Sequence, residues 1–89
     1  MREFSITIDD HQQPMRVGPA GEIAQEASRY TSEISMVTED RRLNARDIFV
    51  WMQLRSKAGD VLDFEVTGPD EDKAAESFSA YLKDQLTRA

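Results

Sequence analysis

The chain has 89 residues, of which 39% are hydrophobic and 31% are charged. This length and balance suit one globular domain covering residues 1–89, and they differ from the composition of a disordered chain. The formal net charge of −6 and the lack of a Lys/Arg cluster argue against nucleic-acid binding, because phosphate contacts need clustered basic side chains.

The sequence also lacks several features of secreted, membrane-bound or metal-binding proteins. It has no cysteine, which excludes disulfides, thiol chemistry and Cys-based metal sites. The first residues alternate polar and apolar and do not form the apolar run of a signal peptide. No segment approaches the roughly 20 apolar residues of a membrane span. We therefore expect a cytoplasmic protein with no membrane association, no cofactor and no bound metal.

The first predicted elements are a strand and a helix. Phe4, Ile6 and Ile8 alternate with polar residues, which predicts a strand with one buried face. A loop follows, and the apolar positions change to helical spacing from Pro19 onwards, as far as Tyr30. Proline suits a first helical position because its missing N–H would have no partner there.

Two strands and a short helix are predicted next. Residues 33–37 alternate between apolar and polar, residues 39–42 form a polar turn, and residues 43–45 return as a third strand. Asp47 then precedes the apolar run IFVWMQL as an N-cap. We expect a short helix here that closes near Gly59.

The last predicted elements are a strand and a helix. Leu62, Phe64 and Val66 alternate with acidic residues, and a Gly-Pro pair then breaks the chain. The final helix starts with the acids at residues 70–72 and carries an apolar stripe from Ala74. This order of elements predicts an α+β fold, an open-faced sandwich in which three helices cover one face of a four-stranded antiparallel sheet.

The alternation also predicts which side chains fill the core and which lie on the uncovered face of the sheet. We expect the core to contain Phe4, Ile6, Ile8, Ile34, Met36, Leu62, Phe64, Val66, Ala20, Ile23, Ala27, Phe78 and Leu82. We expect the opposite face to carry Glu3, Ser5, Thr7, Glu33, Asp63 and Glu65.

Candidate catalytic residues are few. His11, the one histidine, is either a proton shuttle or phosphoacceptor, or an exposed loop residue. No carboxylate–histidine–nucleophile set can be assembled around it, and the acids at residues 70–72 lack the glycine and distal Glu of a calcium loop. We therefore expect a protein that is not an enzyme.

The helix after Asp47 is more informative because it is apolar nearly all round. Trp51 and Leu54, helped by Val50, suit the core of so small a domain. The remaining apolar side chains are then exposed, which is typical of a partner surface. They are Ile48, Phe49 and Met52. The alternative is a helix wrapped by the C-terminal segment.

Taken together, these residues resemble the histidine-containing phosphocarrier (HPr) family of the bacterial phosphoenolpyruvate:sugar phosphotransferase system, over essentially the whole chain. The family's motif Gly-(Leu/Ile)-His-Ala-Arg-Pro-Ala matches PMRVGPA at residues 14–20. In this match Pro19 and Ala20 are kept, but the phosphoryl-accepting histidine falls on Arg16 and the phosphate-pairing arginine falls on Gly18. Neither replacement supports the phosphoryl chemistry, since arginine lacks the imidazole and glycine has no guanidinium.

The resemblance extends to a second motif, Asn-x-Lys-Ser followed by an apolar helix, which matches residues 44–47. Asp47 replaces the serine that a regulatory kinase phosphorylates in some bacteria. A carboxylate at this N-cap resembles phosphoserine with less charge, and the alternative is that Asp47 is only a good N-cap. In the family, the apolar positions that match Ile48, Phe49 and Met52 contact partner proteins.

The resemblance implies a regulatory protein that lacks the phosphorylatable histidine and binds phosphotransferase-system proteins or a metabolic or transcriptional regulator. The implied partner surface has Asp47 at its centre and comprises Arg16, Val17, Ala20, Ile48, Phe49 and Met52. One alternative is a divergent but working phosphocarrier that uses His11. A further alternative is an assembly role through strand exchange, and we expect a monomer or a weak homodimer.

Overall fold

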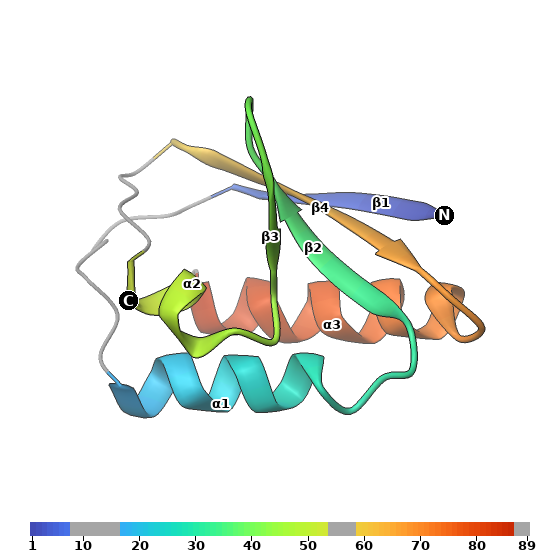
Figure 1. Ribbon diagram of the computed structural model, residues 1–89, viewed down its shortest axis with the longest axis horizontal. Coiled ribbons are helices and arrows are strands. Elements are labelled where there is room, and N and C mark those ends of the chain that lie inside the picture. The colour runs from blue at the N-terminus through green and yellow to red at the C-terminus, as the bar shows by residue number, and fades with distance from the viewer. Residues whose placement is uncertain (8–16, 54–58, 87–89) are drawn as a thin grey trace.

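The computed structural model describes residues 1–7, 17–53 and 59–86. A four-stranded sheet with the strand order β1-β4-β2-β3 forms one layer, and the helices lie together on one side of it (Figure 1). The elements in chain order are β1 (Arg2–Thr7), α1 (Val17–Ala27), β2 (Glu33–Val37), β3 (Arg42–Asn44), α2 (Ile48–Met52), β4 (Val61–Thr67) and α3 (Glu71–Leu86).

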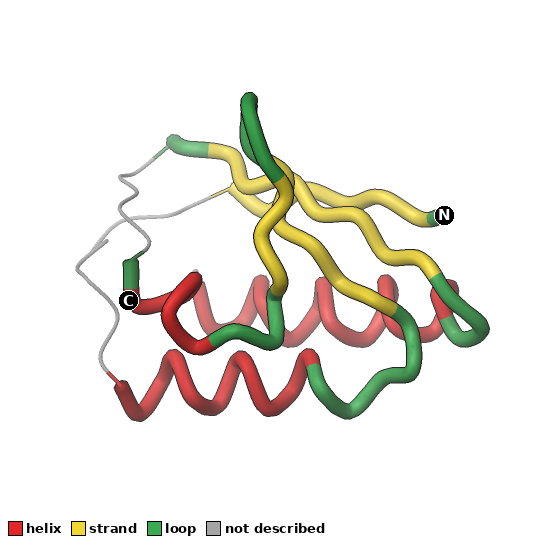
Figure 2. The backbone as a smooth tube through the Cα atoms, viewed as in Figure 1, coloured by secondary structure: helices red, strands yellow, loops and turns green. Residues whose placement is uncertain are grey.

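All strand pairs in the sheet are antiparallel, and their register sets the two faces. Phe64 in β4 lies opposite both Phe4 in β1 and Met36 in β2, so the apolar residues of three strands share one face. Figure 2 shows α1 and α3 running side by side beneath this face, while the other face has no helix on it. The predicted open-faced α+β sandwich is therefore confirmed.

The core fills the space between the sheet and the helices. Burying each of its large side chains contributes roughly 1.5–3 kcal/mol. Most of the predicted core side chains are buried: Ile6, Ile34, Met36, Phe64 and Val66 from the sheet, and Ala20, Ile23, Ala27, Phe78 and Leu82 from the helices.

The prediction is only partly right for Phe4 and Leu62, which are half-buried. Phe4 belongs to the edge strand β1, where it stacks on Phe64 at a ring-centroid distance of 4.9 Å but has no strand on its outer side. The predicted core residue Ile8 lies outside the described residues.

The uncovered face of the sheet is polar, as predicted. Glu3, Ser5, Thr7, Glu33 and Asp63 are exposed there, whereas Glu65 is partly buried. The Ser5 hydroxyl donates to Asp63 Oδ1 at 2.6 Å, and Arg42 forms a salt bridge with Glu65.

Within the described part of the chain, no helix is both long and apolar enough to cross a membrane.

The boundaries of α1 and α2 differ from the predicted ones. α1 begins at Val17 instead of Pro19, which remains in the first turn, where no backbone N–H has a partner within the helix. The helix ends at Ala27, and the last turn tightens there: the Ser28 amide is shared between the carbonyls of Ala24 and Gln25, each at 3.1 Å, and the Ser28 hydroxyl also donates to the Ala24 carbonyl at 2.9 Å. α2 already ends at Met52, and residues 54–58, over which we expected it to continue, lie outside the described residues.

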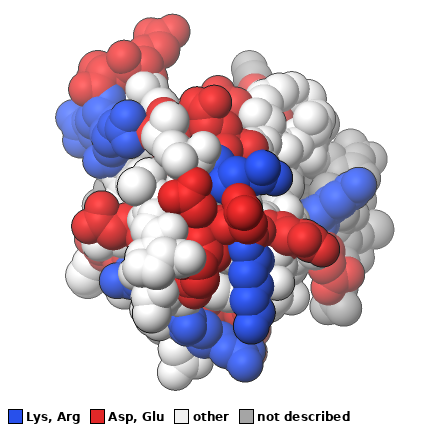
Figure 3. Space-filling view, turned by 90° about the vertical axis from the view of Figure 1, so that its right-hand side faces the viewer, with Lys and Arg blue, Asp and Glu red and all other residues white. Residues whose placement is uncertain are grey.

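One end of the molecule is held together by Asp70, which precedes α3. Its carboxylate accepts from the Ser32 hydroxyl at 2.5 Å, from the Ser32 amide at 2.9 Å and from the Thr31 amide at 3.1 Å. The Ser32 hydroxyl contributes most to holding the pKa of Asp70 at about 2, and the amides of Ser32 and Thr31 add to it. Figure 3 faces this end and shows acidic and basic side chains lying against one another.

These bonds predict a pH-dependent contribution to stability. Because the pKa of Asp70 is lowered on folding, its contribution is complete above about pH 4 and is lost as the pH falls towards about 2. We expect Asp70→Asn to lower the melting temperature at pH 6, and the difference from the wild type to shrink between pH 4 and pH 2. Thermal melts followed by circular dichroism across this pH range measure the difference in melting temperature between the variant and the wild type. Asp72→Asn, at an exposed position, is the control, and a difference for Asp70→Asn that stays constant with pH would contradict the assignment.

Candidate functional site

The start of α1 and the short helix α2 lie next to each other, although they come from different parts of the sequence (Figure 1). On the α1 side the approach involves Gly21, which lies next to Ile48. A Cβ atom at position 21 would lie 3.5 Å from Cδ1 of Ile48, which is an ordinary contact distance. The two helices therefore form a single continuous face.

The residues at the start of α1 differ in exposure. Gly18 and Pro19 are exposed, and Val17 begins the helix. Ala20 is fully buried, so its predicted place among the partner-contacting residues is corrected: it belongs to the core that supports this face from beneath. His11 and Arg16 lie outside the described residues.

Side-chain and backbone hydrogen bonds hold the turn before α2. The Arg46 amide donates to Asn44 Oδ1 at 2.9 Å, and the Asp47 amide donates to the Asn44 carbonyl at 3.0 Å. Asp47 has the extended backbone of an N-cap, and its Oδ1 accepts from the Phe49 amide at 2.9 Å. The predicted N-cap is therefore confirmed, and it fixes an exposed carboxylate at the start of α2.

Trp51 anchors α2 to the rest of the domain. Its side chain is fully buried, stacks on Phe64 at a centroid distance of 6.0 Å, and donates from Nε1 to the Ala45 carbonyl at 2.8 Å. Val50 is half-buried, as its predicted supporting role requires. Leu54, the other predicted anchor, lies outside the described residues.

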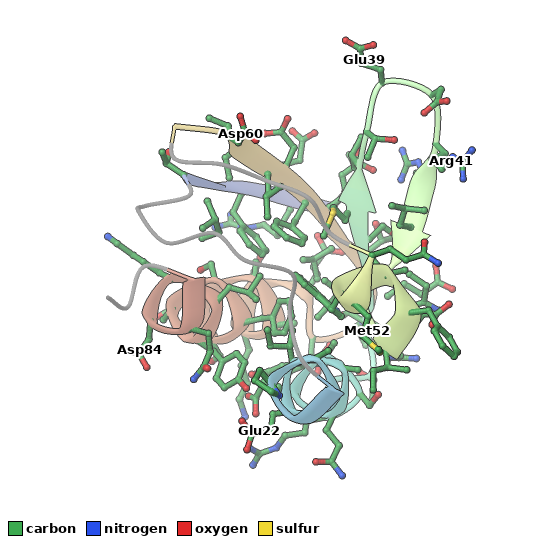
Figure 4. All side chains as sticks on the ribbon, turned by 90° about the vertical axis from the view of Figure 1, so that its left-hand side faces the viewer. Glu22, Glu39, Arg41, Met52, Asp60 and Asp84 are labelled. Carbon is green, nitrogen blue, oxygen red and sulfur yellow. The ribbon has the colours of Figure 1, made fainter. Side chains whose placement is uncertain are left out.

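The exposed apolar patch on α2 is smaller than predicted. Phe49 is 62% exposed. Ile48 and Met52 are only partly exposed, because both side chains pack against the core cluster. Figure 4 looks at the end where α1 begins and shows Met52 on α2 beside α1. The patch therefore consists of one prominent aromatic ring with two partly accessible apolar side chains.

Arg46, in the turn before α2, is a residue that sequence reasoning did not single out. Its Nη2 donates to the carbonyls of Tyr30 and Ser32 at 2.7 Å and 3.0 Å, so the guanidinium ties the turn before α2 to the connection between α1 and β2. A basic residue next to an N-cap gives no signal of such a bond, because the two carbonyls are brought near it only by the fold.

The described side chains of this face offer apolar and charged contacts. An exposed aromatic ring lies two residues from a fixed carboxylate, and both are held by a capped, anchored helix. Within residues 1–7, 17–53 and 59–86, no group of three His, Cys, Asp or Glu side chains could hold a metal ion.

Comparison with known sequences places these features in a family. The model of the PTS HPr component phosphorylation site matches residues 3–84. The HPr-like protein Crh of Bacillus subtilis is 29% identical over 72 residues, which cover 81% of this chain and 85% of that protein. The HPr-like protein Crh of Halalkalibacterium halodurans is 32% identical over 69 residues, which cover 78% of this chain and 82% of that protein.

The fold is also similar to solved structures over its whole length. The crystal structure of HPr-C-His from Thermoanaerobacter tengcongensis superposes with a TM-score of 0.79 at 25% identity, covering 100% of this chain and 99% of that one. The structure of Crh from Bacillus subtilis, described as a dimer with a swapping domain, has a TM-score of 0.68 at 25% identity and covers 93% and 90% of the two chains. These matches confirm the family resemblance.

Proposed function

Because this chain belongs to the HPr family of the phosphotransferase system, we propose that it is a regulatory member that binds proteins and does not carry a phosphoryl group. The motif match described above supports this, since it aligns the family's histidine with Arg16 and its arginine with Gly18. We further propose that the protein is cytoplasmic and is not an enzyme.

The observation that carries the proposal is the exposed ring of Phe49 next to the N-cap carboxylate of Asp47. A large exposed aromatic on a rigid, capped helix is typical of a binding hot spot. We propose that Ile48 and Met52 flank it and that Arg16 and Val17 complete the surface. Its partner is a phosphotransferase-system protein or a metabolic or transcriptional regulator.

The face is tested by pull-down with the wild type and with Phe49→Glu. We expect the wild type to retain a specific partner, identified by mass spectrometry, and Phe49→Glu to lose it. Val61→Glu is a matched control, because Val61 is another large exposed apolar side chain, 55% accessible, on β4. Equal loss of the partner in both variants would contradict the proposed face.

The absence of phosphoryl transfer is tested separately. After incubation with phosphoenolpyruvate and the first enzyme of the phosphotransferase system, we expect no acid-labile phosphate on the chain. Labelling would overturn the proposal in favour of a working phosphocarrier. If the label then disappeared in His11→Ala, the carrier residue would be His11.

The charge of Asp47 can be separated from its capping role. Asparagine is an equally good N-cap without a charge, whereas alanine removes the cap at a cost of about 1 kcal/mol. If the carboxylate takes the place of phosphoserine, Asp47→Asn weakens partner binding severalfold with almost unchanged stability. Asp47→Ala weakens partner binding and also lowers the stability of the domain. Isothermal titration with the captured partner and thermal melts measure the two effects, and wild-type affinity in Asp47→Asn would show that Asp47 is only an N-cap.

We also propose a monomer that forms at most a weak homodimer. Structures of HPr from Thermoanaerobacter tengcongensis and of Crh from Bacillus subtilis are described as dimers, which supports self-association in this family. Sedimentation velocity over a range of protein concentrations measures the strength of self-association. A dimer that persists at low concentration would contradict the proposed weak homodimer.

A further inference from the structure

A groove of about 580 Å³ lies between α1 and α3. Figure 4 shows α3, with Asp84, and α2, with Met52, on different sides of α1, so the groove is separate from the face formed by α1 and α2. It is lined by Glu22, Gln25, Glu26, Arg29, Tyr81 and Gln85.

The wall on the α1 side is a stripe of polar residues at helical spacing. Glu26 is already engaged, since its carboxylate pairs with Arg29 at 3.2 Å and accepts from the Tyr30 hydroxyl at 3.3 Å. Glu22 is exposed and takes part in no salt bridge within the described residues. The groove therefore has one carboxylate without a salt bridge among the described residues, that of Glu22, beside one that is paired with Arg29.

The wall on the α3 side is aromatic. Tyr81 is half-buried and stacks on the buried ring of Phe78 at a centroid distance of 6.2 Å, so its own ring is held in place. Burial, followed by the negative charges of Glu22 and Glu26, raises the pKa of the Tyr81 hydroxyl. Since Glu26 is paired with Arg29, the carboxylate of Glu22 is the charge that favours a cation beside the ring.

We propose that this groove is a second protein-binding surface, which receives an arginine side chain from a partner protein. A planar guanidinium can lie over the ring of Tyr81 and donate two hydrogen bonds to the carboxylate of Glu22, a combination that the compact ammonium group of lysine does not match. The net negative charge of the groove disfavours an acidic segment.

This site is independent of the face around Phe49. The two surfaces use different sides of α1, so one partner can occupy the groove while another occupies α2. The inference goes beyond the proposed regulatory function and would stand if that function were wrong.

The experiment is an NMR titration of the isotope-labelled full chain with a short, end-blocked peptide of alternating alanine and arginine, at low ionic strength. We expect the largest amide shifts around Glu22, Tyr81 and Gln85. The same peptide with citrulline, a neutral isostere of arginine, is expected to produce no saturating shift. The lysine version is expected to bind more weakly than the arginine version.

Variants decide whether the groove itself is responsible. We expect Glu22→Gln to weaken binding about two- to fivefold, and Tyr81→Leu to weaken it by a similar factor. Glu33→Gln removes the same charge from the uncovered sheet face and is the matched control, while Phe49→Glu keeps the groove and tests independence from the other face. Both are expected to bind like the wild type.

The inference is overturned if Glu33→Gln weakens binding as much as Glu22→Gln, or if the shifts spread over the carboxylates of the sheet face. Equal binding of the citrulline peptide would also overturn it. Should Tyr81→Leu fail to fold, the exposed Glu22→Gln still decides the outcome.

Discussion

Replacing Trp51 with alanine is expected to lower the free energy of unfolding by about 3–5 kcal/mol. The indole is fully buried between α2 and the sheet, so its removal leaves a large cavity next to Phe64. The Ala45 carbonyl also loses its hydrogen bond at 2.8 Å. Domains of this size are stable by only about 5–15 kcal/mol, so the variant is expected to lose a large share of its folding free energy.

Urea denaturation followed by far-UV circular dichroism measures this loss. Trp51→Phe is the matched control, because it keeps an aromatic ring in the core and removes the indole donor, at an expected cost of about 1–3 kcal/mol. A smaller effect for Trp51→Ala than for Trp51→Phe would show that the indole is not the anchor of α2. Because Trp51 holds the helix that presents Phe49, partner binding is expected to fall in step with stability.

The second large effect is expected for Gly68→Ala, which should destabilise the domain by about 2–4 kcal/mol. Gly68 has a φ of +150°, a conformation that a residue with a Cβ atom rarely adopts. An added Cβ would also lie 2.6 Å from the Ser32 Cα and 2.9 Å from its Cβ. Since the first of these atoms is backbone, the neighbour cannot rotate away, and the Asp70–Ser32 bonds would have to shift.

Gly18→Ala is the control for this prediction. Position 18 has no atom within 4 Å of an added Cβ and lies in the first turn of α1, so we expect unchanged or slightly higher stability. Thermal melts of both variants compare the two glycines directly. Equal destabilisation of the two variants would contradict the special role of close packing at Gly68, because Gly→Ala at an open position is expected to stabilise through the unfolded chain. The predicted contrast would confirm close packing at Gly68.

The fold could be predicted from the sequence because its signals are local. Alternation in the strands and helical spacing in α1 and α3 are each contained in a single segment, and the register then brings Phe4, Met36 and Phe64 onto one face. The start of α1 was missed by two residues, since Pro19 is compatible with any position in the first turn.

The candidate site was predictable only in part. Asp47 was recognisable as an N-cap because the signal is its place before an apolar run. The exposure of Ile48 was overestimated, because Ile48 packs against a core built from segments far apart in the sequence. Arg46 and the groove between α1 and α3 depend on contacts between segments far apart in the sequence, and no local pattern encodes them.

The burial of Trp51 has a practical consequence. The chain contains one tryptophan, and it lies in the same short helix as Phe49. Its intrinsic emission therefore comes from a single, water-shielded position directly beneath the proposed partner surface. Docking on α2 should perturb this emission without any attached dye, whereas an arginine peptide in the groove between α1 and α3 should leave it nearly unchanged. The molecule thus carries its own optical probe for telling its two surfaces apart.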